Sequence, residues 1–201
     1  VWIVRGFDID GTSYLIDNGL APSLEDFEEI IERTHASYGV IDTGYRTQEI
    51  YEFISNGSGF WFGAKGWDKM PSSYRLVKID PYSPVKGQKS RGARINLLHV
   101  NKAIWQEELA QKRAGSSLDW FVYNNVDGEY VRQMLATSLI DKVNKRGQVV
   151  REWVVEGRDD HYWDCENYAI ALSSAFGIGG VLPEKETDPA PKNKKPNLPP
   201  D

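Results

Sequence analysis

Apolar residues recur along the chain in short runs whose spacing predicts strands and helices. The first seven residues are apolar and β-branched, turn residues follow at 8–11, and a second apolar run begins at residue 12. This order predicts an antiparallel hairpin at the start of the chain. Further short apolar runs bounded by Gly or Asn predict more strands. The predicted strands are 1–7, 12–19, 38–44, 59–66, 95–100, 117–123 and 147–157.

Apolar residues three or four positions apart predict five helices. Ser23 is expected to cap the first helix and Gly39 to end it. Asn101 and Gly115 are expected to bound the third helix, and Asp127 to cap the fourth. Residues 69–94, which are rich in Pro and end in a basic run, give no assignment. The predicted helices are 23–38, 46–57, 101–115, 128–140 and 163–176.

The order of these elements predicts a mixed α/β domain with antiparallel strands at its start, spanning residues 1–180. Residues 181–201 are rich in Pro, Lys and Asp and have little to bury, so they are predicted to be a disordered tail. The chain begins without Met in an apolar run, which we interpret as a fragment that starts inside a strand.

Composition excludes several classes of protein. The single cysteine, Cys165, cannot form an internal disulfide, and it is expected to pack as a small core side chain. No apolar run is long enough to span a membrane, and the start of the chain lacks the pattern of a signal peptide. The formal net charge of -5 argues weakly against a nucleic-acid-binding protein. This argument is weak because a catalytic site can itself concentrate acidic residues.

Two aspartates are the main candidates for chemistry. Asp42 ends an apolar strand, and strand ends are where α/β proteins place ligands. Asp164 lies near the start of the last helix, within the acidic run 159–166 that also contains His161. Helical spacing turns Glu166 about 200° away from Asp164, so both carboxylates cannot face one site.

Carboxylates brought close together repel one another, and a divalent cation relieves that repulsion. Oxygen ligands favour Mg²⁺ or Mn²⁺ over Zn²⁺, and two such ions can promote phosphodiester cleavage. The chain contains no phosphate-binding GxxxxGK[ST] loop, no GxSxG motif and no paired-cysteine zinc motif.

Each candidate also has a purely structural interpretation. Asp42 before Gly44 is ordinary turn chemistry, and an acid in the first turn of a helix is favoured by the helix dipole, as Asp164 would be. Asp160 and Glu166 are expected to be solvated, or to contact the metal-binding residues without binding the metal themselves. Basic residues could instead contact DNA phosphates or simply be solvated. They are Lys65, Lys86, Lys89, Arg91 and Arg94.

Two segments, "VIDTGYRTQEIYEF" (40–53) and "HYWDCENYAIAL" (161–172), resemble two blocks of the nuclease domain of large terminase subunits from lambda-like tailed bacteriophages. The segment "RGFDIDGTSYLIDNG" (5–19) resembles the hairpin that precedes them, so the resemblance covers residues 1–180. It implies an RNase H-like fold, in which helices flank a central mixed sheet that includes the N-terminal hairpin. It also implies a metal-dependent endonuclease that cuts concatemeric viral DNA during packaging.

The resemblance assigns Asp42 and Asp164 as metal-binding catalytic acids. His161, in the loop that enters the last helix, is a further catalytic candidate from the sequence itself, as a metal neighbour, a DNA contact or a helix cap. The family carries another catalytic Asp on a strand upstream of the hairpin, and the printed sequence does not contain that strand. The implied cofactors are two Mg²⁺ or Mn²⁺ ions. The implied partners are double-stranded DNA, an ATPase motor domain on the same polypeptide, the small terminase subunit and the portal, with no membrane. The implied location is the host cytoplasm.

Two alternatives to the packaging nuclease stay open. One is another RNase H-like nuclease, such as a junction resolvase or an RNA–DNA hybrid nuclease, which would share the acidic residues but prefer other substrates. The other is a non-catalytic interaction module that tethers packaging subunits through the tail at residues 183–201.

Overall fold

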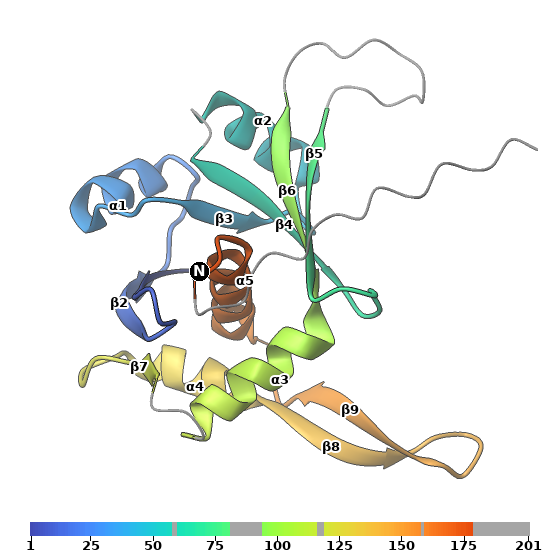
Figure 1. Cartoon of the computed structure of the whole chain (residues 1–201). Helices are drawn as coiled ribbons and strands as arrows, with labels where there is room; N and C mark the ends of the chain where they lie inside the picture. Colours follow the sequence, from blue (N-terminus) through green and yellow to red (C-terminus); the bar gives the residue numbers. More distant parts are fainter. Residues whose placement is uncertain (58–59, 81–93, 116–118, 158, 179–201) are drawn as a thin grey trace, which may run out of the picture.

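The structure is a computed structural model that describes residues 1–57, 60–80, 94–115, 119–157 and 159–178. These residues form five helices and nine strands (Figure 1). The helices are α1 (Asp26–Thr34), α2 (Thr47–Asn56), α3 (Lys102–Arg113), α4 (Gly128–Ala136) and α5 (His161–Ala175). The strands are β1 (Trp2–Phe7), β2 (Ser13–Gly19), β3 (Gly39–Asp42), β4 (Trp61–Trp67), β5 (Tyr74–Ile79), β6 (Ile95–Asn101), β7 (Trp120–Phe121), β8 (Thr137–Val143) and β9 (Val149–Val155).

The strands are arranged in three sheets, which confirms a mixed α/β architecture. β1 and β2 form the expected antiparallel hairpin, and β7 adds to β2 in parallel. A second sheet has the order β3-β4-β6-β5, with β3, β4 and β6 parallel and β5 antiparallel to β6. β8 and β9 pair only with each other. The described residues therefore differ from the single central sheet that was expected.

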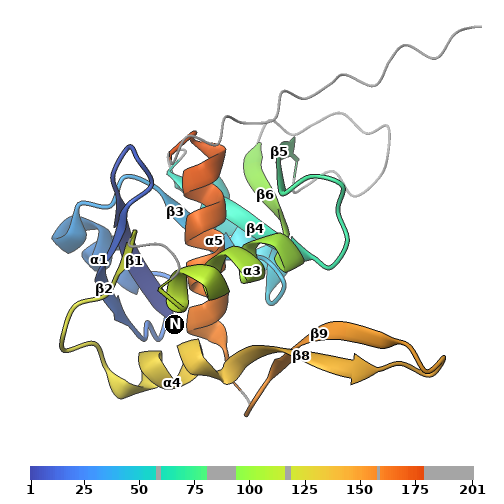
Figure 2. The same cartoon turned by 60° about the horizontal axis from the view of Figure 1, so that its bottom comes forward.

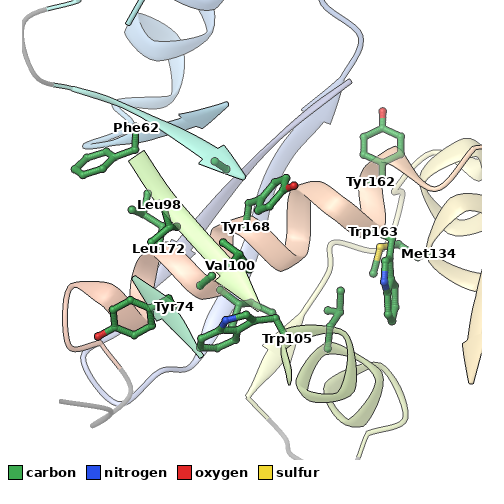
Figure 3. Close-up of a cluster of buried hydrophobic side chains, with 14 of the residues drawn as sticks. Phe62, Tyr74, Leu98, Val100, Trp105, Met134, Tyr162, Trp163, Tyr168 and Leu172 are labelled. Atoms are coloured by element: carbon green, nitrogen blue, oxygen red, sulfur yellow. The ribbon is translucent and has the colours of Figure 1, made fainter. Parts of the chain in front are cut away.

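The second sheet buries a different set of side chains on each face. Phe62, Leu98 and Val100 point to the face that α5 covers (Figure 3). Ala64 joins them in the larger core. Trp61 and Ile95 alternate with them and pack against α2 and α1 on the other face. Strand alternation explains the division, because neighbouring residues of a strand point to opposite faces.

Helix α5 is the centre of the molecule. It packs against β1, β3, α3 and α4, and so it connects the two larger sheets (Figures 1 and 2). Trp163 and Ala171 are completely buried, and most other α5 side chains are buried too. None of the described helices combines the length and apolar character that crossing a bilayer requires.

Most predicted elements are confirmed, but both ends of the first predicted helix and the end of the fourth are wrong. Helix α1 is shorter than expected: Glu25, not Ser23, occupies the cap position, and the helix ends where His35 adopts a left-handed conformation. Residues 137–140 belong to strand β8, not to α4, although Asp127 caps α4 as expected by accepting a hydrogen bond from the Tyr130 backbone. Strand β5 lies inside the segment left unassigned, and the predicted tail lies outside the described residues.

Gly39 at the start of β3 allows close packing of an aromatic ring. A Cβ at this position would lie 2.1 Å from Cζ3 of Trp61, a buried side chain with little room to move. We therefore expect Gly39→Ala to lower the free energy of unfolding by about 1–3 kcal/mol, the range for overpacked cores. Urea denaturation of both proteins measures the difference.

Gly128 provides the matched control, because a Cβ there would have no atom within 4 Å. Gly128→Ala is expected to leave stability unchanged or slightly higher, since Ala favours helices more than Gly does. Equal urea midpoints for Gly39→Ala and wild type would contradict the packing argument.

Candidate functional site

Asp42 lies at the carboxyl end of β3 and points to the α5 face of the second sheet. It pairs in register with Ala64, which is buried under α5, and side chains paired across neighbouring strands share a face. The backbone N–H of Gly44 donates a 2.9 Å hydrogen bond to Oδ1 of Asp42, so the predicted turn chemistry is present as well. Asp42 itself is exposed. The turn holds the carboxylate in place at the open edge of the sheet.

Asp164, in the first turn of α5, lies on the same side as Asp42. Its side chain is 25% exposed. Burial raises the pKa of Asp164, the Lys102 ammonium lowers it, and the carboxylates of Asp160 and Asp42 raise it further. The structure thus brings together the two aspartates that the sequence identified, within range of electrostatic repulsion.

Lys102 is a site residue that the sequence analysis did not identify. Its Nζ lies 3.6 Å from Oδ1 of Asp164, and its alkyl chain packs over Gly66, where a Cβ would lie only 2.4 Å from Cε. Lys102 is the first residue of α3, directly after β6. Because β3, β4 and β6 are parallel, their carboxyl ends meet at one edge, and this rule could have placed Lys102 beside Asp42.

Tyr168 forms the buried floor of the site, one turn after Asp164 on α5. Its ring points from α5 toward β4 (Figure 3), and its hydroxyl lies near the backbone of Gly66 on that strand. Burial raises the pKa of the Tyr168 hydroxyl, and the charges of Asp42 and Asp164 raise it further. Tyr168 is therefore a neutral group placed beside both carboxylates.

The other described candidates contact groups other than these two carboxylates. The exposed His161 is the first residue of α5, and its ring Nε2 lies 3.7 Å from Asp159. Lys65 follows Ala64 on β4, so it points to the opposite face of the sheet, where its Nζ lies 5.0 Å from the centre of the Trp67 ring.

Arg94 precedes β6 and is exposed at the edge of the sheet opposite Asp42. Three further DNA-contact candidates, Lys86, Lys89 and Arg91, lie outside the described residues. The structure therefore brings none of the described basic candidates together with Asp42 and Asp164.

Glu166 is not solvated, contrary to one of the expectations from the sequence. Its side chain is fully buried, and both oxygens bind the Arg5 guanidinium, at 2.6 Å from Nε and 2.9 Å from Nη2. The hydroxyl of Tyr130 donates a third hydrogen bond to Glu166, at 2.7 Å. Asp164 and Glu166 thus point in different directions, as helical spacing predicted, and Glu166 connects α5 to β1 and α4.

A divalent metal ion such as Mg²⁺ needs several oxygen donors around it. Within the part of the chain that the structure describes, no three His, Cys, Asp or Glu side chains are grouped so that they could hold a metal ion. Asp42 and Asp164 supply oxygen donors of the kind that Mg²⁺ and Mn²⁺ prefer. Their mutual repulsion is the condition that a cation relieves. The chemistry of these two side chains fits such an ion.

Comparison with known proteins identifies a family. Residues 31–185 match the family model described as "Terminase large subunit gpA, endonuclease domain". Searches of curated proteins and of solved structures found no match. The matched segment includes Asp42, Lys102, Asp164 and Tyr168, and it covers most of the chain. The chain therefore belongs to the endonuclease-domain family of the terminase large subunit gpA, which acts on DNA during phage packaging.

Proposed function

We propose that this domain hydrolyses phosphodiester bonds of concatemeric double-stranded viral DNA, with two divalent metal ions (Mg²⁺ or Mn²⁺) bound in part by Asp42 and Asp164. The observation that carries the proposal is the convergence of these two aspartates from β3 and α5, which lie more than 100 residues apart in sequence. When bound, the metal ions would activate water and neutralise charge on the phosphate.

The residues of the site have distinct roles in this proposal. Asp42 is held by its turn and keeps Oδ2 available as a ligand, whereas Asp164 is fixed by the rigid helix α5. Lys102 offsets the negative charge of Asp164 before a metal binds, and it can then move toward a DNA phosphate, because its side chain is 36% exposed. Tyr168, buried and neutral, excludes water from the inner side of the site.

We further propose that the fold is RNase H-like and that an upstream strand completes it. β1 and β3 both pack on α5, and in the described residues each is hydrogen-bonded to another strand on one side only. A strand between them would join the two larger sheets. The family resemblance implies a third catalytic Asp on such a strand, and this Asp would complete the ligand set. The same resemblance implies a motor domain, the small terminase subunit and the portal as partners in the host cytoplasm.

Cleavage of supercoiled plasmid tests the proposal directly. The chain is extended upstream by the adjoining natural residues and incubated with Mg²⁺, Mn²⁺ or EDTA. We expect nicking and linearisation with either metal and none with EDTA. Cleavage that persists in EDTA would contradict the metal-dependent mechanism.

A panel of substrates separates the proposed nuclease from its relatives. Linear duplex, a four-way junction and an RNA–DNA hybrid are compared at equal concentration. We expect the duplex to be cut, because the family acts on packaged DNA. Cleavage restricted to the junction or the hybrid would instead identify a resolvase or a hybrid nuclease.

A further inference from the structure

Strands β8 and β9 form a two-stranded ribbon that extends away from the rest of the molecule (Figures 1 and 2). Its base is fixed to the end of α5 that carries Asp164. Trp153 contacts Trp163 with ring centres 6.1 Å apart, and Thr137 lies 3.5 Å from the carboxylate of Asp160. From Ile140 onward nearly every residue of the ribbon is exposed, and among the described strands β8 and β9 pair with each other alone.

The tip of the ribbon is a well-defined turn that presents two cations. Gly147 adopts a left-handed conformation and donates to the Asn144 carbonyl, and the Asn144 side chain accepts from the backbones of Arg146 and Gln148. This is a type I turn followed by a left-handed Gly, a common way to close a hairpin. Lys145 and Arg146 occupy its two central positions, where both are exposed.

The outer half of the ribbon is basic in a chain that is acidic as a whole. Residues 142–151 contain four cations and no acid, whereas the complete chain has a net charge of -5. Two of the cations form ion pairs with strand neighbours, Lys142 with Glu152 at 2.9 Å and Arg151 with Asp141 at 3.9 Å. Exposed pairs of this kind contribute little stability, so DNA phosphates can replace the acidic partners.

The distribution of apolar side chains on the ribbon favours binding in a DNA groove over binding to a flat protein surface. Val143 pairs with Val149 on one face of the ribbon, and Ile140 and Val150 lie on the other face. All four are exposed, and neither face carries a continuous apolar surface. A protein docked on one face would leave the other face in water. A groove encloses both faces.

The dimensions of the ribbon agree with those of duplex DNA. Seven residues in each strand give a length of about 23 Å at about 3.3 Å per residue, and the strands are about 5 Å apart. The major groove of B-DNA is about 12 Å wide and admits a two-stranded ribbon.

We infer that the β8–β9 ribbon is a DNA-binding arm that enters a groove of the substrate duplex and contacts its phosphates through Lys142, Lys145, Arg146 and Arg151. The inference rests on the proposed function, because it takes duplex DNA as the substrate of the domain. The arm holds the duplex beside the acidic site through contacts to phosphates, and phosphate contacts carry no sequence information.

Binding of a fluorescein-labelled duplex of about 30 base pairs tests the arm without any need for cleavage. Fluorescence anisotropy is measured in EDTA over a series of salt concentrations for wild type and for Lys145→Gln/Arg146→Gln. Each phosphate contact contributes about 0.9 to the slope of log K against log salt, so the variant should lose about 2 from that slope. The loss should be the same on duplexes of different sequence.

Two controls make the result specific. Lys145→Arg/Arg146→Lys keeps both charges at the same positions and should bind like wild type. Asp42→Asn should bind like wild type and fail to cleave, which separates failure of the arm from failure of the proposed active site. Circular dichroism should be unchanged in every variant, because both tip residues are exposed and their backbone turn is retained.

The inference is overturned if neutralising the tip leaves affinity and salt dependence unchanged, whether or not wild type cleaves plasmid. It is also overturned if wild type shows no duplex binding, and the plasmid assay then judges the nuclease separately. A change in self-association by sedimentation, with unchanged DNA binding, would overturn it in favour of a protein contact.

Discussion

Arg5→Met is expected to lower the free energy of unfolding by about 3–5 kcal/mol, the cost of breaking a buried ion pair by removing one partner. Arg5 and Glu166 both have fully buried side chains, and Arg5 also donates to the side chain of Ser13 and the carbonyl of Phe121. Without the guanidinium, the Tyr130 hydroxyl would be the one partner left to Glu166 among the described residues. Urea denaturation measures the loss.

A double variant distinguishes an unpaired charge from a simple loss of packing. Arg5→Met/Glu166→Leu removes both charges, and replacing a whole buried pair with apolar side chains is often neutral. The double variant should therefore be more stable than Arg5→Met alone. Arg132→Met, which breaks the exposed pair with Glu129, should leave stability almost unchanged. A double variant as unstable as the sum of its single variants would contradict this account.

The Arg5–Glu166 pair also shows what sequence patterns can and cannot predict. Helical spacing predicted that Glu166 faces away from Asp164, and it does. Spacing within one helix carries no information about which strand covers the other face. The partner, Arg5, lies 161 residues away within an otherwise apolar strand, and only the folded chain brings the two together.

Element boundaries failed where local preference and tertiary pairing compete. The segment at 128–140 has apolar residues at helical spacing, yet Thr137 and Ile140 are β-branched and pair with β9. Strand β5 was missed because prolines lie on either side of it, at 71 and 81, and they bound the strand without interrupting it.

Those candidate site residues that carry a signal in their own sequence segment could be predicted. Asp42 at a strand end and Asp164 at a helix start each carry a signal in their own segment. Lys102 and Tyr168 do not, since their roles depend on the order β3-β4-β6 and on the packing of α5 beneath it.

Asp42→Asn and Asp164→Asn are each expected to reduce metal-dependent plasmid cleavage by about 10³-fold, equivalent to about 4 kcal/mol in the reaction barrier. Both substitutions keep the size of the side chain and remove the negative charge that attracts a cation. The double variant should be about as inactive as either single variant, because residues that act as one unit do not have additive effects. Initial rates of plasmid nicking measure all three losses.

Stability measurements separate this loss of activity from unfolding. Because burial and two neighbouring acids hold the pKa of Asp164 above its usual value, the ionised carboxylate is less favourable in the folded chain than in the unfolded one. Asn removes that penalty, so Asp164→Asn should melt at the same temperature as wild type or higher. Asp8→Asn, in the exposed turn after β1, should retain both activity and stability. Full activity in Asp42→Asn, or losses that add in the double variant, would show that the two aspartates do not share a catalytic metal site.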